Sequence, residues 1–148
     1  MSKSILKSYL EYGKRYRNKK QFDFLSTSCF KLGDEFLISD SYSVVVLKDS
    51  KGLEIKEDLL GISNHYQNLS SKDEFIRVID VDTIKESKEE SIPLDVNNYE
   101  IGVKIANRII KLIKCDLVEI MGGGYTPIIK LTNTKTKERA YLLPMRKY

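Results

Sequence analysis

Two acidic residues and a lysine in the first half of the chain are of the types found in the active sites of metal-dependent nucleases. Asp40 ends a strand-like run, and Glu54 and Lys56 follow as a Glu-x-Lys pattern. In such enzymes the two carboxylates hold Mg²⁺ and the lysine helps to polarise the attacking water. The pattern is loose, because a chain with 31% charged residues contains such triplets by chance. A small metal-dependent nuclease is therefore kept as an alternative hypothesis.

Three adjacent glycines in the stretch IMGGGYTPIIKL, residues 120–131, raise the question of a phosphate-binding loop. Such a loop must lead directly into a helix, whose N-terminal amides hold the anion. Here the glycines connect one strand-like run to another, and Pro127 opens the second run. Lys130 is not at the position of a P-loop lysine, and neither Ser nor Thr follows it directly. The glycines therefore predict a hairpin connection.

The side chains that could ligate a metal or act as nucleophiles are otherwise scattered. His65 is the only histidine, and Cys29 and Cys115 are far apart in sequence. A zinc site needs three or four nitrogen or sulfur ligands, and a nucleophilic triad would have to use His65, in a polar stretch. We expect no catalytic centre, no metal, no cofactor and a surface position for this histidine. Two cysteines, no signal-peptide pattern and no long apolar run favour a cytoplasmic protein without a membrane partner.

Basic side chains form the other candidate, a surface for a polyanion. Lys104, Arg108 and Lys111 are spaced i, i+4 and i+7, opposite an isoleucine stripe. Two such cationic helix faces on a sheet would suit phosphate backbones without reading bases. The alternative is two ordinary amphipathic helices with solvated lysines. The residues predicted to bind DNA are Lys3, Lys7, Lys14, Lys104, Arg108, Lys111 and Lys114.

Charge is distributed unevenly along the chain, whose formal net charge is +4. Residues 1–20 carry seven basic side chains and one acidic, and residues 101–148 carry ten and three. Residues 21–48 carry two basic and four acidic side chains, and residues 49–100 carry six and thirteen. This pattern predicts one basic and one acidic surface, and the basic one would attract a polyanion.

Two amphipathic helices are expected to position these cations. Apolar residues recur at helical spacing from Ser4 to about Arg17 and again over residues 97–116, where Asn97 or Asn98 would cap the helix. The apolar stripe of the second helix is Ile101, Ile105, Ile109 and Leu112. Residues 22–48 predict two or three antiparallel strands with a tight turn at LGDE. A short helix is expected within 56–75, strands at 75–82, 92–96, 117–121, 127–133 and 138–146, and a charged loop at 83–91.

The order of elements at the end of the chain is characteristic. A strand, a helix, a strand, a turn and two further strands lead to Leu143, Pro144, Met145 and Arg146. Over residues 93–146 this order and ending resemble the end of the bacterial DNA polymerase III beta sliding clamp, which closes in Met-Pro-Met-Arg or Met-Pro-Val-Arg. More weakly, LKSYLEYGKRYRNKK is placed like the first helix of a clamp, and GDEFLISDSYSVVVL is similar to a clamp strand region.

The resemblance implies a function. Clamp helices line the hole through which DNA passes, and the outer surface of clamps tends to be acidic. The closing residues help to form a groove for short peptides from polymerases and other partners, which makes Leu143, Pro144, Met145 and Arg146 the predicted partner-binding residues. A bacterial clamp chain has three such domains and two chains close the ring, whereas this chain has the length of one domain.

The sequence therefore predicts an α+β, clamp-like domain over residues 1–148, with two helices packed on antiparallel sheets. We expect a non-catalytic DNA-associated accessory protein that binds the DNA backbone without sequence specificity. Replication or repair proteins and further copies of the chain are its other expected partners. The alternatives are an interaction module that uses the C-terminal strand without DNA, and the nuclease based on Asp40, Glu54 and Lys56.

Overall fold

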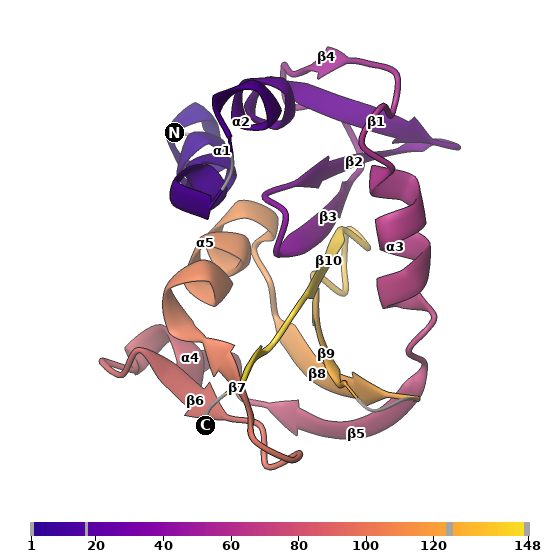
Figure 1. The fold of residues 1–148 in the computed structure, drawn as a ribbon. Helices are drawn as coiled ribbons and strands as arrows, with labels where there is room; N and C mark the ends of the chain where they lie inside the picture. The colour runs from indigo at the N-terminus through magenta and orange to yellow at the C-terminus, as the bar shows by residue number, and fades with distance from the viewer. Residues whose placement is uncertain (1, 17, 124–125, 147–148) are drawn as a thin grey trace.

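The structure, a computed structural model, contains helices and strands along the whole chain (Figure 1). It describes residues 2–16, 18–123 and 126–146, with the side chains at 2–4, 13, 15 and 16 outside that description. The helices are α1 (Ser2–Leu10), the 3-10 helix η1 (Glu11–Tyr16), α2 (Lys19–Ser26), α3 (Ile62–Ser70), α4 (Val81–Glu86) and α5 (Val103–Ile113). The strands are β1 (Ser28–Leu32), β2 (Glu35–Ser39), β3 (Ser43–Leu47), β4 (Glu54–Ile55), β5 (Glu74–Ile79), β6 (Ser91–Pro93), β7 (Tyr99–Gly102), β8 (Leu117–Gly122), β9 (Ile128–Thr132), β10 (Arg139–Leu142) and β11 (Met145–Arg146).

Most strands belong to one eight-stranded sheet in the order β4-β1-β2-β3-β10-β9-β8-β5. Its neighbouring strands are antiparallel except β1 and β4, which are parallel. A second sheet has the order β11-β7-β6. The expected combination of helices with a largely antiparallel sheet is confirmed, although the described residues form five α-helices rather than two.

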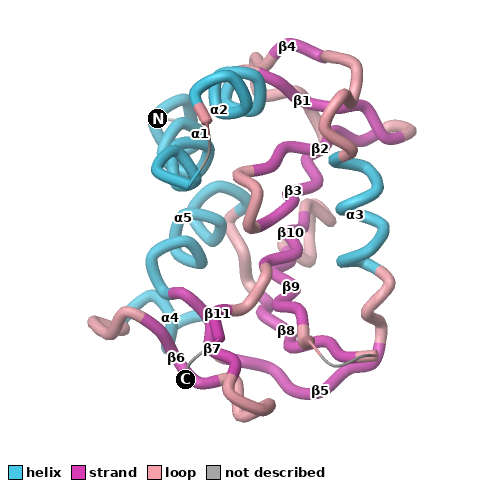
Figure 2. The backbone as a smooth tube through the Cα atoms, viewed as in Figure 1, coloured by secondary structure: helices cyan, strands magenta, loops and turns pink. Residues whose placement is uncertain are grey.

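Two parts of the large sheet repeat one arrangement. The strands β1, β2 and β3 follow the helices of the N-terminal segment, and β8, β9 and β10 follow α5. The last strands of the two sets, β3 and β10, pair antiparallel in the middle of the sheet, with Val45 opposite Ala140. The helices α1 and α5, which precede the two sets, pack against the same face of the sheet (Figure 2).

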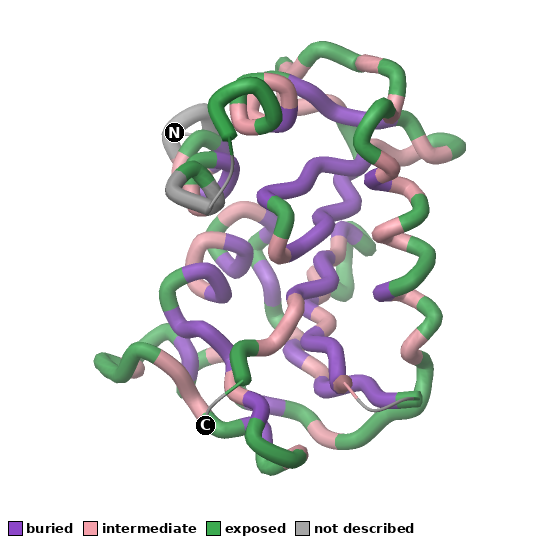
Figure 3. The backbone as a smooth tube through the Cα atoms, in the orientation of Figure 1, coloured by how far each residue is buried: buried purple, intermediate pink, exposed green. Residues whose placement is uncertain are grey.

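Both faces of the large sheet are covered, by different helices (Figure 3). On the inner face, as we call the side of α1 and α5, both helices pack against alternate residues of the sheet. On the outer face, α3 packs against the intervening residues of the same strands. The buried strand residues are Cys29, Ile38, Val45, Leu47, Ile79, Val118, Ile120, Ile129, Leu131, Ala140 and Leu142 on the inner face, and Phe30, Leu37, Val44, Val46, Ile128 and Tyr141 on the outer face.

The N-terminal segment differs from the sequence prediction. The first α-helix ends at Leu10 and continues as a 3-10 helix past Gly13, a residue that costs helicity. Residues 22–26, expected in a strand, belong to α2. The Asn18 side chain caps this helix by accepting a hydrogen bond from the Gln21 amide at 2.8 Å. Local capping therefore outweighs the strand preference of the aromatic residues that follow.

The second predicted helix begins later than expected. Tyr99–Gly102 form β7, and Gly102 occupies the N-cap position without a side-chain cap, so the prediction of Asn97 or Asn98 as the cap is wrong. Ile101 lies opposite Ile92 of β6, and is therefore absent from the helical stripe. Pairing of β7 with both β6 and β11 explains the shortened helix, because it buries Tyr99 and Ile101 in extended backbone.

Three further expectations can be compared with the structure. The glycine stretch joins the antiparallel strands β8 and β9, which confirms the hairpin connection, and residues 124–125 lie outside the described residues. The short helix within 56–75 is confirmed as α3, whereas the expected charged loop at 83–91 contains most of α4. None of the helices in the described residues has the length and apolar character required to cross a lipid bilayer.

Candidate nucleic-acid interface

The helices α1 and α5 lie in contact on the inner face, which brings both predicted cationic segments together. The buried side of α5 is apolar, with Ile105, Ile109 and Ile113 each at most 4% exposed. Burial of this stripe forces the lysines on the opposite side of the helix toward solvent. The sequence pattern therefore predicted which side of α5 is cationic, although it misplaced where the helix begins.

A groove of about 410 Å³ runs between the two helices. Three of the predicted DNA-binding residues, Lys104, Arg108 and Lys111, lie on its α5 side. Ser8 and Ile5 form the α1 side, and Asn107 completes the lining. Amide and hydroxyl groups among cations provide hydrogen bonds to phosphate oxygens as well as charge.

The cationic surface continues beyond this groove. A neighbouring hollow of about 650 Å³ shares Lys104 and Arg108 with it and also reaches Lys14, which follows α1. Two acidic residues, Glu11 and Glu90, lie at the same hollow. Predicted cations from both helical segments therefore border one continuous depression, which acidic side chains limit on one side.

Arg108 has a structural role that the sequence did not reveal. It is half-buried, and its guanidinium donates a hydrogen bond at 2.7 Å to the backbone oxygen of Ser8. The same guanidinium lies 5.4 Å from the ring centre of Tyr12. The side chain therefore connects α5 to α1 and η1, so that part of its hydrogen-bonding capacity is used to hold the groove together.

The predicted lysines differ in how far intramolecular contacts engage them. Lys7 forms an exposed ion pair with Glu11 at 3.7 Å, and Lys14 lies 5.6 Å from the ring centre of Phe22. Lys104, Lys111 and Lys114 are exposed, and in the described part of the chain no ion pair involves them. The side chain of Lys3 lies outside the described residues.

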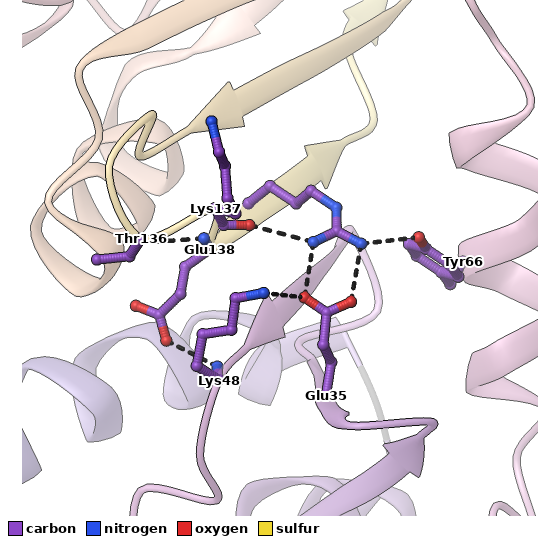
Figure 4. A network of polar contacts seen from close by, with 7 residues as sticks. Glu35, Lys48, Tyr66, Thr136, Lys137 and Glu138 are labelled. Atoms are coloured by element: carbon purple, nitrogen blue, oxygen red, sulfur yellow. Dashed lines mark hydrogen bonds and ion pairs between the residues drawn. The ribbon is translucent and has the colours of Figure 1, made fainter.

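The outer face carries a second set of cations, which the sequence analysis did not place. Glu35 accepts two hydrogen bonds from Arg139, at 2.9 and 3.1 Å, and one from Lys48 at 2.9 Å (Figure 4). Arg139 also donates a hydrogen bond to the Tyr66 hydroxyl of α3. These bonds, the one from Arg139 above all, lower the pKa of Glu35 to about 2. Here the cations are paired with a carboxylate, and Arg139 also attaches α3 to the sheet.

The four predicted partner-binding residues follow β10, and three of them contact different parts of the fold. Leu143 packs with the outer-face core and its amide donates to the Tyr42 carbonyl. Met145 belongs to β11, which pairs with β7. Its sulfur lies so close to Gly102 that a Cβ atom added to this glycine would be 3.1 Å from it. Met145 also borders the larger cationic hollow, whereas the Arg146 guanidinium lies 5.9 Å from the Tyr99 ring centre. Only Met145 therefore joins the candidate interface.

Two of the three residues of the nuclease alternative, Glu54 and Lys56, lie together at β4, whereas Asp40 follows β2. Asp40 is fully buried, and its Oδ1 accepts hydrogen bonds from the Tyr42 and Ser43 amides at 2.9 and 2.8 Å. Glu54 belongs to β4, which β1 separates from β2, and it lies 3.9 Å from Lys56. In the residues that the structure describes, no cluster of three or more His, Cys, Asp and Glu could hold a metal ion. The nuclease therefore stays a hypothesis.

His65, for which a surface position was expected, is less exposed than that expectation implies. It lies on α3, is half-buried, and borders a pocket of about 390 Å³ between α2 and α3. Burial lowers the pKa of its imidazole, because the charged form loses solvation. The described residues provide no hydrogen-bond partner for its buried Nε2. The irregular spacing of apolar residues around it gave little sign of a helix with a buried side.

Comparison of the chain with protein-family models, with curated protein sequences and with solved structures gives no match. The geometry of the groove is therefore the basis for assigning a function.

Proposed function

We propose that this chain is a DNA-associated accessory protein with a clamp-like fold, which binds the phosphate backbone of a duplex without sequence preference. The groove between α1 and α5 is the observation that carries the proposal. It combines Lys104, Arg108 and Lys111 with neighbouring polar groups, and Lys14 extends the same surface. Contacts of this kind position a protein on DNA but do not distinguish bases.

The arrangement of the fold supports the clamp-like part of the proposal. Two sets of three antiparallel strands meet at the β3–β10 pair, and the two helices α1 and α5 lie together on one face. This is the disposition that the sequence resemblance implies, with the helices toward the DNA. The position of α3 on the outer face differs from that simple scheme. A single copy docked on the side of a duplex satisfies the groove geometry, and we propose this mode rather than a closed ring.

Charge reversal of the exposed lysines tests the proposal. The variant Lys104→Glu, Lys111→Glu and Lys114→Glu changes three side chains that make no ion pair among the described residues, and it leaves Arg108 in place. We expect its affinity for a fluorescent duplex of random sequence to fall at least about 100-fold at low ionic strength. The slope of log K against log salt concentration should decrease in magnitude by roughly three, because about three phosphate contacts are lost.

A second triple variant separates local contacts from net charge. Lys31→Glu, Lys135→Glu and Lys137→Glu changes the net charge by the same amount at exposed positions that do not border the groove. We expect this control to bind DNA within about threefold of the original chain, since only long-range attraction is reduced. Equal loss of binding in both triple variants would show that the groove is not the site.

A further inference from the structure

Exposed apolar side chains are concentrated at the two ends of the eight-stranded sheet. At one end, Phe75, Ile76 and Val78 of β5 are 55%, 40% and 51% exposed. At the other end, Ile55 of β4 and the following Leu59 are 54% and 69% exposed. Large exposed apolar residues that lie next to one another, rather than singly, mark surfaces that a partner covers.

The end formed by β5 has the backbone geometry to accept another strand. This six-residue strand is the last of the sheet, so its only strand partner among the described residues is β8. Phe75 lies opposite Met121 and Val78 lies opposite Glu119, which places both side chains on the outer face. A bulge between Phe75 and Arg77 turns Ile76 out of the regular alternation. The edge therefore offers unpaired backbone groups next to an apolar surface.

Acidic residues flank this apolar surface at both ends. Asp73 and Glu74 precede it, and Asp80 and Asp82 follow it, all four with exposed side chains. The basic residue within β5, Arg77, is already paired with Asp95 at 2.6 Å. A segment that brings cations to the flanks and apolar side chains to the centre therefore matches this edge in charge and in polarity.

A second copy of the chain matches the edge less well. Self-association would bring β5 against another β5, or against the β4 end of the sheet. The β4 end is also acidic, with Glu54, Glu57 and Asp58 against Lys56. Like charges would meet in both arrangements, and β4 provides only two residues for pairing.

We propose that the β5 edge is a docking site for an extended segment of a partner protein, one that alternates apolar and basic side chains. The segment pairs with β5 as an additional strand, its apolar side chains cover Phe75 and Val78, and its cations face Asp73 and Asp82. Strand addition of this kind gains affinity from main-chain hydrogen bonds and specificity from the alternate side chains. The site does not use the groove between α1 and α5, so it holds or fails independently of DNA binding.

A labelled synthetic peptide of about ten residues, alternating Val or Ile with Lys or Arg, is the probe for this site. Fluorescence anisotropy should show saturable binding, and an analogue with Glu at every basic position should bind at least about tenfold more weakly. The double variant Phe75→Ser and Val78→Ser should lose at least about tenfold in affinity. The matched control is the double variant Ile55→Ser and Leu59→Ser, which removes two exposed apolar side chains at the opposite end of the sheet and should stay within twofold.

Hydrogen exchange of the unaltered protein provides a readout that does not depend on any variant. Peptide binding should slow amide exchange within residues 74–79 more than in any other strand. Three results would overturn the proposal: no saturable binding of the basic peptide, equal binding of both peptides, or protection confined to another region. Concentration-dependent dimerisation that Phe75→Ser abolishes would assign the edge to a second copy instead.

Discussion

The two faces of the large sheet use their cations in opposite ways. On the inner face, Lys104 and Lys111 border an open groove, and no ion pair among the described residues engages them. On the outer face, Arg139 and Lys48 converge on Glu35, whose carboxylate is only 20% exposed. A cation that is bonded to a carboxylate holds elements together, whereas a solvated one retains its charge for a partner. The same residue type therefore stabilises the fold on one face and is available for binding on the other.

The largest expected effect is on the free energy of unfolding, and it differs between the cores on the two faces of the sheet. Ile109 of α5 is fully buried in the inner core, whereas Leu69 of α3 lies in the smaller outer core at 6% exposure. We expect Ile109→Ala to lower the free energy of unfolding by about 4 kcal/mol and Leu69→Ala by about 2.5 kcal/mol. Urea denaturation of both variants measures the difference. An equal or larger loss for Leu69→Ala would contradict the ranking of the two faces.

Removal of Arg139 should separate stability from binding. In Arg139→Leu, Glu35 keeps Lys48 as its only cation among the described residues, and Tyr66 loses its donor. We expect a loss of about 2–3 kcal/mol in unfolding free energy, with DNA affinity within about twofold of the original. Adding Glu35→Leu should recover a large part of the loss, because no uncompensated charge remains. If the double variant were as unstable as the single one, lost packing of Arg139 would be the cause.

The pH dependence of stability provides a third comparison. The pKa of Glu35 is about 2 in the folded protein, against an ordinary value of 4.5, chiefly because Arg139 donates hydrogen bonds to it. Between these values the unfolded chain binds the proton more readily, so the contribution of Glu35 is present above pH 4.5 and is lost toward pH 2. We expect this loss to be on the order of 2 kcal/mol. Glu35→Gln should flatten that part of the stability curve, whereas Glu57→Gln, at an exposed loop position, should leave it unchanged.

The smallest effect tests the mixed role of Arg108. Arg108→Lys keeps the charge in the groove but loses the planar guanidinium that bonds Ser8 and lies near Tyr12. We expect a decrease of about 1 kcal/mol in unfolding free energy, with DNA affinity within about threefold. Lys104→Arg is the control and should change neither quantity appreciably. A large loss of DNA affinity in Arg108→Lys with unchanged stability would make Arg108 primarily a phosphate ligand.

Several features with a local cause were predicted from the sequence, although α2, which Asn18 caps, was not. The isoleucine spacing of α5 identified its buried side, and the turn between β1 and β2 lies where LGDE placed it, with Gly33 at a φ of 60°. Lys130 and Arg139 alternate with buried strand neighbours, a signal that would have placed them on the outer face. The role of Arg139 as the partner of Glu35 and of Tyr66 in α3 was not predictable, since Glu35 and Arg139 are 104 positions apart.

Features that depend on distant partners were missed. Tyr99 and Ile101 carry helix-compatible spacing, but pairing of β7 with β11 makes them a strand. The groove required α1 and α5 to meet, and the contact of Arg108 with Ser8 joins residues 100 positions apart. Composition indicated a basic surface without showing which cations would be paired, because pairing is decided by tertiary contacts.

The seam between β3 and β10 has a consequence for how the chain reaches its structure. All five residues of β3, Ser43–Leu47, are buried. One of the two strands that pair with β3 is β10, Arg139–Leu142, which comes much later in the sequence. During synthesis, β1, β2 and β3 leave the ribosome long before β10. Until β10 is made, the valine-rich strand β3 has an unpaired and apolar edge. We expect nascent chains stalled before residue 139 to aggregate or recruit chaperones, and full-length chains not to, which ribosome-arrested fragments of graded length can measure. Completion of the sheet around β3 therefore awaits the synthesis of residues 139–142.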